Sequence, residues 1–153
     1  MNAPITEAEQ FLLRAAERGR ARNLPYAGEV TPIEAHRLVN AIGARLIDVR
    51  SRFEYEYIGR VPGSALIEWK SWPDGEFNPH FLADLRRQYA PDDIVLFLCR
   101  SGIRSHSAAV TAAEAGFNRA FNIVEGFEGD LDANGQRGHL GGWRKAGLPW
   151  EQN

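Results

Sequence analysis

The stretch IVLFLCRSGIRS, residues 94–105, joins an apolar run to a short polar turn and then to a helix. Residues 94–98 form the most continuous apolar run of the chain and predict a buried strand. The polar turn begins at Cys99, the only cysteine. An alanine-rich helical pattern follows over residues 103–115 and ends before Gly116, a residue typical of helix ends. The chain therefore passes from strand to helix through a turn that starts with its single thiol.

Strands and helices alternate over the rest of the chain. Apolar patterns predict further strands at residues 29–31, 46–49, 65–67 and 121–124, and helices at residues 51–57 and 78–89, with another starting at Pro32. Strands separated by helices of this length are typical of a parallel sheet that is covered on both faces. We therefore expect an α/β domain of three layers with a mainly parallel, five-stranded sheet. Ligands of such sheets bind outside the carboxyl ends of the strands, where Cys99 lies.

The first 28 residues stand apart from this alternation. Residues 6–20 have a helical pattern, which starts with the form of a capping box at Thr6 to Glu9. The helix itself is expected to end at Gly19. A linker then leads into the alternating region. The expected organisation is an N-terminal helical extension and linker at residues 1–28 and a domain at residues 29–150.

Composition limits the functional classes that need to be considered. With 153 residues, 44% of them apolar and 25% charged, the chain is long enough for one core and has an ordinary globular composition. A net charge of −2 gives no support for nucleic-acid or membrane partners. One cysteine excludes an internal disulfide, and four scattered histidines show no metal-ligand spacing, so no metal or organic cofactor is expected. The first residues lack the apolar core of a secretory signal, so the expected location is cytoplasmic.

The turn after residue 98 has the features of a reactive thiol site. The thiolate is the nucleophilic form of cysteine, and inward-pointing loop N–H groups, the start of the following helix and two arginines all favour a negative charge there. A lone cysteine at the end of a buried strand is often only a small core residue. Two arginines, a glycine and a helix start within six residues favour the reactive interpretation instead. We assign Cys99 as the candidate nucleophile and the rest of the turn as its binding loop: Arg100, Ser101, Gly102, Ile103, Arg104 and Ser105.

Other polar residues near the same end of the sheet are expected to support the site. Asp48 ends a predicted strand and is expected to pair with Arg50 or Arg104, while Glu54 forms a capping box with Ser51. We assign structural roles to Asp48, Arg50 and Glu54. Four aromatic side chains in nearby loops are expected mainly to close the core, with one or two lining an acceptor groove: Trp69, Trp72, Phe127 and Trp143.

With these motifs, the chain resembles single-domain rhodaneses, which are sulfurtransferases. Residues 46–50 (LIDVR) resemble the family's strand that ends in Asp-Val-Arg. Glu54-Tyr55 and residues 59–64 (GRVPGS) resemble its Glu-(Phe/Tyr) and Gly-His-Ile-Pro-Gly-Ala stretch, and residues 142–150 resemble its closing Gly-Trp and Gly-Leu-Pro-Trp segment. The resemblance covers about residues 29–150 and implies the rhodanese-like α/β/α fold.

The resemblance implies a sulfurtransferase activity without a cofactor. Cys99 would take sulfur from a thiosulfate-like anion as a persulfide and pass it to a thiol, including a protein thiol, or to cyanide. Arg100 and Arg104 would hold the anionic end of the donor. Two departures leave the acceptor preference open: Arg60 stands where histidine is usual, and residues 125–130 stand where a plain Gly-Gly turn is more common.

Two alternatives remain beside sulfur transfer. The domain could be a non-catalytic sulfur carrier or partner-binding module. It could also be an enzyme like the phosphatases and arsenate reductases that share the fold. Their loops read Cys-x5-Arg, whereas the interval from Cys99 to Arg104 is Cys-x4-Arg, which forms a smaller cradle and favours a sulfur atom over a phosphoryl group.

Overall fold

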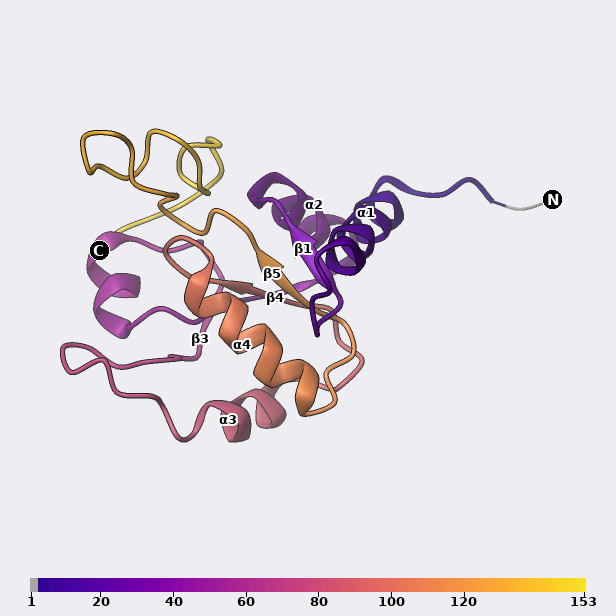
Figure 1. Ribbon diagram of the computed structural model, residues 1–153, viewed down its shortest axis with the longest axis horizontal. Coiled ribbons are helices and arrows are strands. Elements are labelled where there is room, and N and C mark those ends of the chain that lie inside the picture. The colour runs from indigo at the N-terminus through magenta and orange to yellow at the C-terminus, as the bar shows by residue number, and fades with distance from the viewer. Residues whose placement is uncertain (1–2) are drawn as a thin grey trace.

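Five short parallel strands form one sheet at the centre of the computed structural model, which describes residues 3–153 (Figure 1). The strands are β1 (Gly28–Val30), β2 (Arg45–Asp48), β3 (Ala65–Leu66), β4 (Val95–Leu98) and β5 (Ala120–Ile123). Their order across the sheet is β1-β5-β4-β2-β3, and every pair of neighbours is parallel. The prediction of an α/β fold with a mainly parallel, five-stranded sheet is confirmed.

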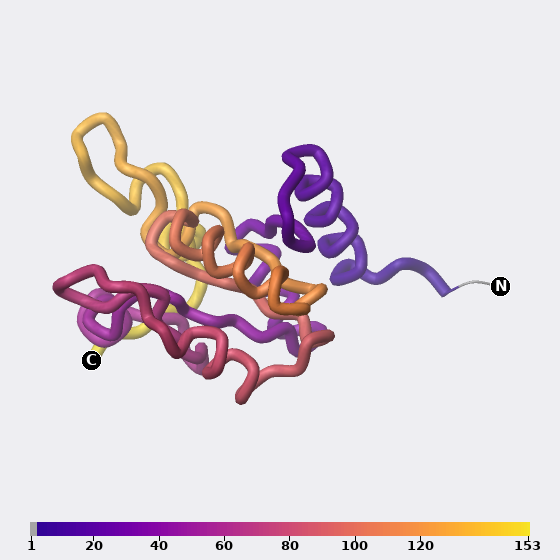
Figure 2. Tube along the Cα trace, turned by 60° about the horizontal axis from the view of Figure 1, so that its bottom comes forward, coloured from indigo at the N-terminus to yellow at the C-terminus, as the bar shows by residue number. Residues whose placement is uncertain are grey.

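Helices cover both faces of this sheet. They are α1 (Glu7–Ala21), α2 (Pro32–Ile42), a π-helical turn η1 (Glu54–Ile58), α3 (Phe81–Gln88) and α4 (Ile103–Glu114). Helices α1 and α2 lie on one side of the sheet and α3 and α4 on the other, which gives the expected three layers (Figures 1 and 2). Between residues 3 and 153, no helix has both the length and the apolar character needed to cross a bilayer.

Alternating side chains of β4 divide the core into two halves. Leu96 and Leu98 pack into the cluster on the α1 and α2 side, whereas Val95 and Phe97 pack into the cluster on the α3 and α4 side. All four side chains are completely buried. Each contributes on the order of 1.5–3 kcal/mol to folding through burial, so the strand before Cys99 is firmly held in place.

The helix starts follow the local signals in the sequence. The side chain of Thr6 accepts from the N–H of Glu9, and the Glu9 carboxylate accepts from the N–H of Thr6. Thr31 and Glu34 make the same reciprocal pair at the start of α2. These bonds satisfy N–H groups that would otherwise have no partner at a helix start. The capping box predicted at Thr6 and the helix start predicted at Pro32 are confirmed.

Helix α1 packs directly on the domain, and it extends beyond the end that the sequence predicts. Gly19 lies inside α1, which continues to Ala21, so the prediction that the helix ends at Gly19 is wrong. A Cβ at Gly19 would lie only 3.1 Å from the Cα of Gly28, so the glycine allows α1 to approach β1 closely. Arg18 donates to both carboxylate oxygens of Glu34, at 2.7 and 3.0 Å, and ties α1 to α2.

Candidate active site

Cys99 is the first residue after β4 and lies at the carboxyl end of the sheet, as expected. It is 1% exposed, and the N–H of Gly102 donates to its sulfur at 3.1 Å. The hydroxyl of Ser105 lies 3.2 Å from the same sulfur. Gly102 has a φ of +106°, a conformation that a side chain would strain, and this turns its amide inward. The Gly102 amide, which donates to the buried sulfur, can stabilise a partial negative charge on it.

The first two backbone carbonyls of the turn accept hydrogen bonds from residues 127–129. The N–H of Phe127 donates to the carbonyl of Cys99 at 2.8 Å, and the N–H groups of Glu128 and Gly129 donate to the carbonyl of Arg100 at 2.9 and 3.2 Å. Because these carbonyls point toward residues 127–129, they do not oppose a negative charge at the sulfur. The segment where the sequence departs from the family pattern therefore supports the thiol loop.

Arg104 is bound to a carboxylate across the loop. Its two terminal nitrogens donate to Glu54 at 2.7 and 3.0 Å, while Ser51 and Glu54 make the expected capping contacts. Burial would raise the pKa of Glu54, but the hydrogen bonds and charge of Arg104, with help from Ser51, lower it overall. Burial likewise opposes the charge on Arg104, and the Glu54 carboxylate outweighs it and raises the Arg104 pKa. The positive charge of Arg104 is thus balanced by Glu54.

Asp48 and Arg50 form a fully buried ion pair below the loop. Both side chains are 0% exposed, and the nitrogen Nη2 of Arg50 donates to Asp48 and to the carbonyl of Gly59, both at 2.7 Å. The Arg50 guanidinium also lies 4.4 Å from the centre of the Phe127 ring. Of the two arginines considered for Asp48, Arg50 is its partner, and the pair connects β2 with η1 and the segment behind the thiol loop.

A cavity of about 410 Å³ opens beside the loop on the side of Arg100 and Arg104. Lys70 and Arg137 add positive charge to its lining, and Phe53 and Trp72 form an aromatic wall. These two rings are stacked, with centres 5.7 Å apart and planes 22° apart, and Trp72 is 64% exposed. A partly basic cavity with an aromatic wall fits an organic anion.

Trp72 alone, among the four loop aromatics singled out in the sequence, lines this cavity. Trp143 and Phe127 are buried in the core on the α1 and α2 side. Trp69 packs edge-on against Phe77 and Phe81. The expectation that most of these aromatics close the core is confirmed.

The predicted binding loop is divided between two sides. Arg100 and Arg104 line the cavity described above, whereas Ser101, Gly102 and Ile103 line a second cavity of about 320 Å³ on the side of β5. Ile103 is 76% exposed. The loop therefore lines two cavities, whereas the buried Cys99 lines neither of them.

Three residues at the site were not singled out from the sequence. Asn122 on β5 accepts from Ser105 and donates to the carbonyl of Gly102. An amide inside the apolar run FNIV was a signal that could have drawn attention to it. Lys70 and Arg137 come from loops without a local motif, and only the folded chain brings them to the thiol loop.

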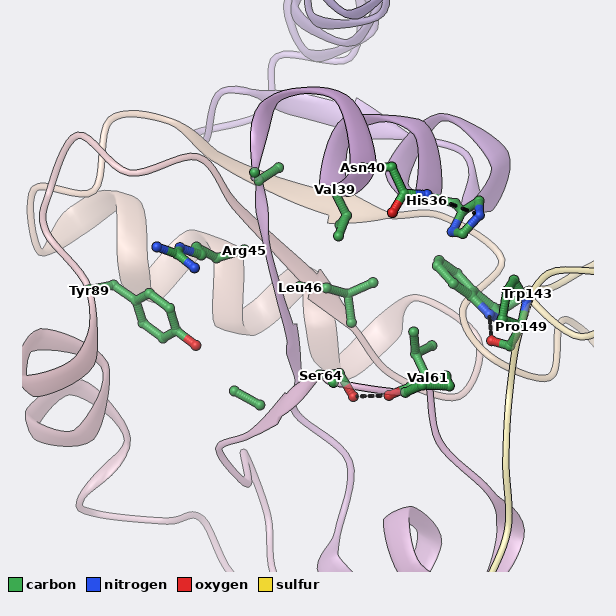
Figure 3. Close-up of a pocket in the computed structure, with 15 residues that line it drawn as sticks. His36, Val39, Asn40, Arg45, Leu46, Val61, Ser64, Tyr89, Trp143 and Pro149 are labelled. Carbon is green, nitrogen blue, oxygen red and sulfur yellow. Dashed lines mark hydrogen bonds between the residues drawn. The ribbon is translucent and has the colours of Figure 1, made fainter.

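Another cavity of about 410 Å³ lies at the opposite end of the sheet, between α2, the start of β2 and the end of α3 (Figure 3). Arg45, Tyr89 and Trp143 are among its lining residues, and no residue of the thiol loop belongs to it. Across residues 3–153, no three His, Cys, Asp or Glu side chains are grouped to hold a metal ion.

The structure is thus an α/β domain with its single cysteine buried at the start of the turn between β4 and α4. Residues 31–133 match the family model of the rhodanese-like domain, and the chain belongs to this family. The resemblance seen in the sequence is confirmed.

Several relatives match most of the chain. The uncharacterized protein RC0915 of Rickettsia conorii is 32% identical over 117 residues, which are 74% of this chain and 88% of that protein. The thiosulfate sulfurtransferase GlpE of Actinobacillus succinogenes is 31% identical over 123 residues, 80% of this chain and 89% of its own. The crystal structure of Rv0390 from M. tuberculosis has a TM-score of 0.75 and 43% identity, and the match covers 84% of this chain and 99% of that one. The chain is thus similar to members of a sulfurtransferase family along most of its length.

Proposed function

We propose that this protein is a sulfurtransferase that carries a sulfur atom on Cys99 between a thiosulfate-like donor and a thiol or cyanide acceptor. The main support for this proposal is the hydrogen bond from the N–H of Gly102 to the Cys99 sulfur, at 3.1 Å, in a turn that leads into α4. An amide and a helix start at one point favour an anion there. The similarity to a protein named as a thiosulfate sulfurtransferase supports the same chemistry.

The reaction proceeds in two displacements. The Cys99 thiolate attacks the outer sulfur of thiosulfate, the S–S bond of thiosulfate breaks, and sulfite leaves with the electron pair. The product is a persulfide whose negative charge lies on the outer sulfur. An acceptor thiolate or cyanide then attacks that outer sulfur, and the bond to the cysteine breaks to regenerate the Cys99 thiolate. With one cysteine in the chain, the sulfur has to leave to an external acceptor.

The ion pair at the loop argues against phosphoryl chemistry. An arginine that binds a phosphoryl group presents two parallel N–H donors to its oxygens. In this protein both terminal nitrogens of Arg104 already donate to Glu54. Arg100 is exposed and lines the cavity, so it is the arginine that we assign to the anionic end of the donor.

The cavity supports an organic thiol as the acceptor. Its volume of about 410 Å³ lies in the range of about 300–1,000 Å³ that is usual for small-molecule sites. Cyanide needs only a small fraction of that space. A chemistry that requires a free thiol suits a reducing compartment, so the proposed location is the cytoplasm.

Intact-mass spectrometry after exposure to thiosulfate tests the proposal directly. We expect the mass of one added sulfur on the wild-type protein and none on the variant Cys99→Ser, which should also lose thiocyanate formation in the presence of cyanide. A variant that still forms thiocyanate would remove Cys99 from the mechanism.

The alternatives predict other results in the same assays. A partner-binding module would show no sulfur adduct although the protein is folded. A phosphatase-like enzyme would hydrolyse an aryl phosphate, and that turnover would be lost in Cys99→Ser.

A further inference from the structure

Asn122 is a buried amide in the apolar strand β5, and it is tied to the thiol loop at two points. Its Oδ1 accepts from the hydroxyl of Ser105 at 2.6 Å, and its Nδ2 donates to the carbonyl of Gly102 at 3.2 Å. Asn122 is 4% exposed and Ser105 is 0% exposed. Ser105 and Gly102 are the two residues that contact the Cys99 sulfur. Asn122 therefore contacts both of the groups that set the surroundings of the sulfur.

The orientation of this amide follows from its partners in the thiol loop. A backbone carbonyl can only accept a hydrogen bond, so the atom of Asn122 that faces the carbonyl of Gly102 is the donor Nδ2. This leaves Oδ1 of Asn122 directed at Ser105.

The direction of these bonds decides what Ser105 offers to the sulfur. A serine hydroxyl has one hydrogen, and this one is donated to Asn122. Toward the sulfur, 3.2 Å away, Ser105 presents a lone pair. A lone pair accepts from an S–H group and tolerates a neutral sulfur, but it gives no hydrogen bond to a thiolate. Turning the hydroxyl toward a thiolate would leave the buried Oδ1 of Asn122 without its donor, which is costly.

We infer that Asn122 is a positioning residue that keeps the Ser105 hydrogen away from Cys99 and so favours a neutral sulfur at this position. Its consequence for persulfide formation rests on the proposed function. When the persulfide forms, the negative charge moves from the cysteine sulfur to the outer sulfur. The Gly102 N–H favours the thiolate, whereas the lone pair of Ser105 favours a neutral inner sulfur and so favours the sulfur-loaded protein. Asn122 contributes to this second preference through Ser105.

The charged groups around the loop stay the same when Asn122 is changed. Around the loop these are the pairs Asp48–Arg50 and Glu54–Arg104, together with Arg100. The cavity that Asn122 itself lines adds Arg22, Glu29, His106 and Glu125. Within residues 3–153, none of these charged groups makes a hydrogen bond with Asn122. A change in the ionisation of Cys99 after substitution of Asn122 therefore reports on the Ser105 hydrogen bond.

The pH dependence of alkylation by iodoacetamide, followed by intact mass, tests this inference, because Cys99 is the only cysteine. In Asn122→Leu the Ser105 hydrogen is free to bind the thiolate, so the midpoint should move to lower pH by about one unit. In Asn122→Asp the carboxylate still accepts from Ser105 and adds negative charge, so the midpoint should move to higher pH. Simple loosening of the loop would move both variants in the same direction, and that result would overturn the inference.

The Ser105→Ala background provides the matched control. Without the hydroxyl, replacing Asn122 by leucine should cause no further shift, and a shift that persists there would also overturn the inference. Thermal unfolding confirms that each variant is folded. If Asn122→Leu is not, Asn122→Ala frees the same hydrogen and should show the same shift, and a midpoint that does not move would count against the role of Asn122.

A second measurement separates this inference from the proposed function. In mixtures of thiosulfate and sulfite at a pH above the alkylation midpoints of both proteins, where free Cys99 is ionised, Asn122→Leu should carry about ten-fold less persulfide relative to free protein than the wild type, the counterpart of a one-unit shift. Alkylation needs no sulfur transfer. If the wild type never forms a persulfide but the alkylation midpoints shift as expected, the proposed function fails while the role of Asn122 stands.

Discussion

Arg104 and Glu54 hold each other at the edge of the thiol loop, with both terminal nitrogens of the guanidinium donating to the carboxylate at 2.7 and 3.0 Å. The two residues are fifty positions apart in the chain and join α4 to η1. Their pairing leaves Arg100 as the loop arginine that faces the cavity without such a partner among the ion pairs of residues 3–153. The two arginines of the turn therefore differ in how freely they can bind an anion.

Replacing Glu54 by glutamine should release Arg104 toward the donor. We expect a lower KM for thiosulfate, because a second guanidinium becomes available, together with a loss of about 1–3 kcal/mol in the free energy of unfolding. Steady-state kinetics and chemical unfolding measure the two effects. Glu56→Gln is the matched control on the same helical turn, because Glu56 pairs only with the exposed Arg52 and should change stability by less than about 0.5 kcal/mol. A higher KM in Glu54→Gln would contradict the assignment.

Replacing Arg100 by glutamine should weaken donor binding without weakening the fold. Arg100 is exposed, so stability should change by less than about 0.5 kcal/mol. Loss of one charge-assisted hydrogen bond, worth about 1.5 kcal/mol, should raise the KM for thiosulfate about ten-fold. Arg86→Gln, an exposed arginine on α3, serves as the control and should leave the KM unchanged. An unaltered KM in Arg100→Gln would show that the donor binds elsewhere.

Replacing Trp72 by alanine should affect the acceptor step according to acceptor size. The stacked pair of Phe53 and Trp72 forms the aromatic wall of the cavity, so KM for an aryl thiol should rise about five- to ten-fold. Turnover with cyanide, which is too small to contact the wall, should stay the same. Leu13→Ala, at another exposed apolar residue, on α1, controls for loss of exposed apolar surface. Equal losses with both acceptors would indicate a general disturbance of the loop instead.

Acid should destabilise the fold through two buried carboxylates. Burial disfavours the charged forms of Glu34 and Glu54, but hydrogen bonds with Arg18 and Arg104 outweigh it, so the pKa of each is lowered below 4.5. A group whose folded pKa is depressed stabilises the fold fully above its unfolded pKa, and that stability is lost as pH falls through the folded pKa. Unfolding free energies should therefore be steady above about pH 5 and decline below pH 4.5. Glu34→Gln should show a shallower decline, and an identical pH profile would remove Glu34 from this effect.

Short-range signals account for the part of the structure that was predicted. The capping box at Thr6, the helix start at Pro32, the apolar strand before Cys99 and the turn into α4 involve residues within a few positions of each other. Backbone hydrogen bonding and burial of an apolar run act over such distances, so these elements could be found at the correct places. The predicted end of α1 was wrong because Gly19 faces β1, a contact between elements that the local pattern does not contain.

The chain alone determined the kind of chemistry this domain can carry: one thiol, at the carboxyl end of a buried strand, on a turn of glycine, serine and arginine. Tertiary structure decided how each of those residues is used. It paired Arg104 with Glu54, placed residues 127–129 behind the turn and brought Asn122 to Ser105. Each of these contacts depends on which strands are neighbours in the sheet, and strand order follows from the packing of the whole core rather than from any local pattern.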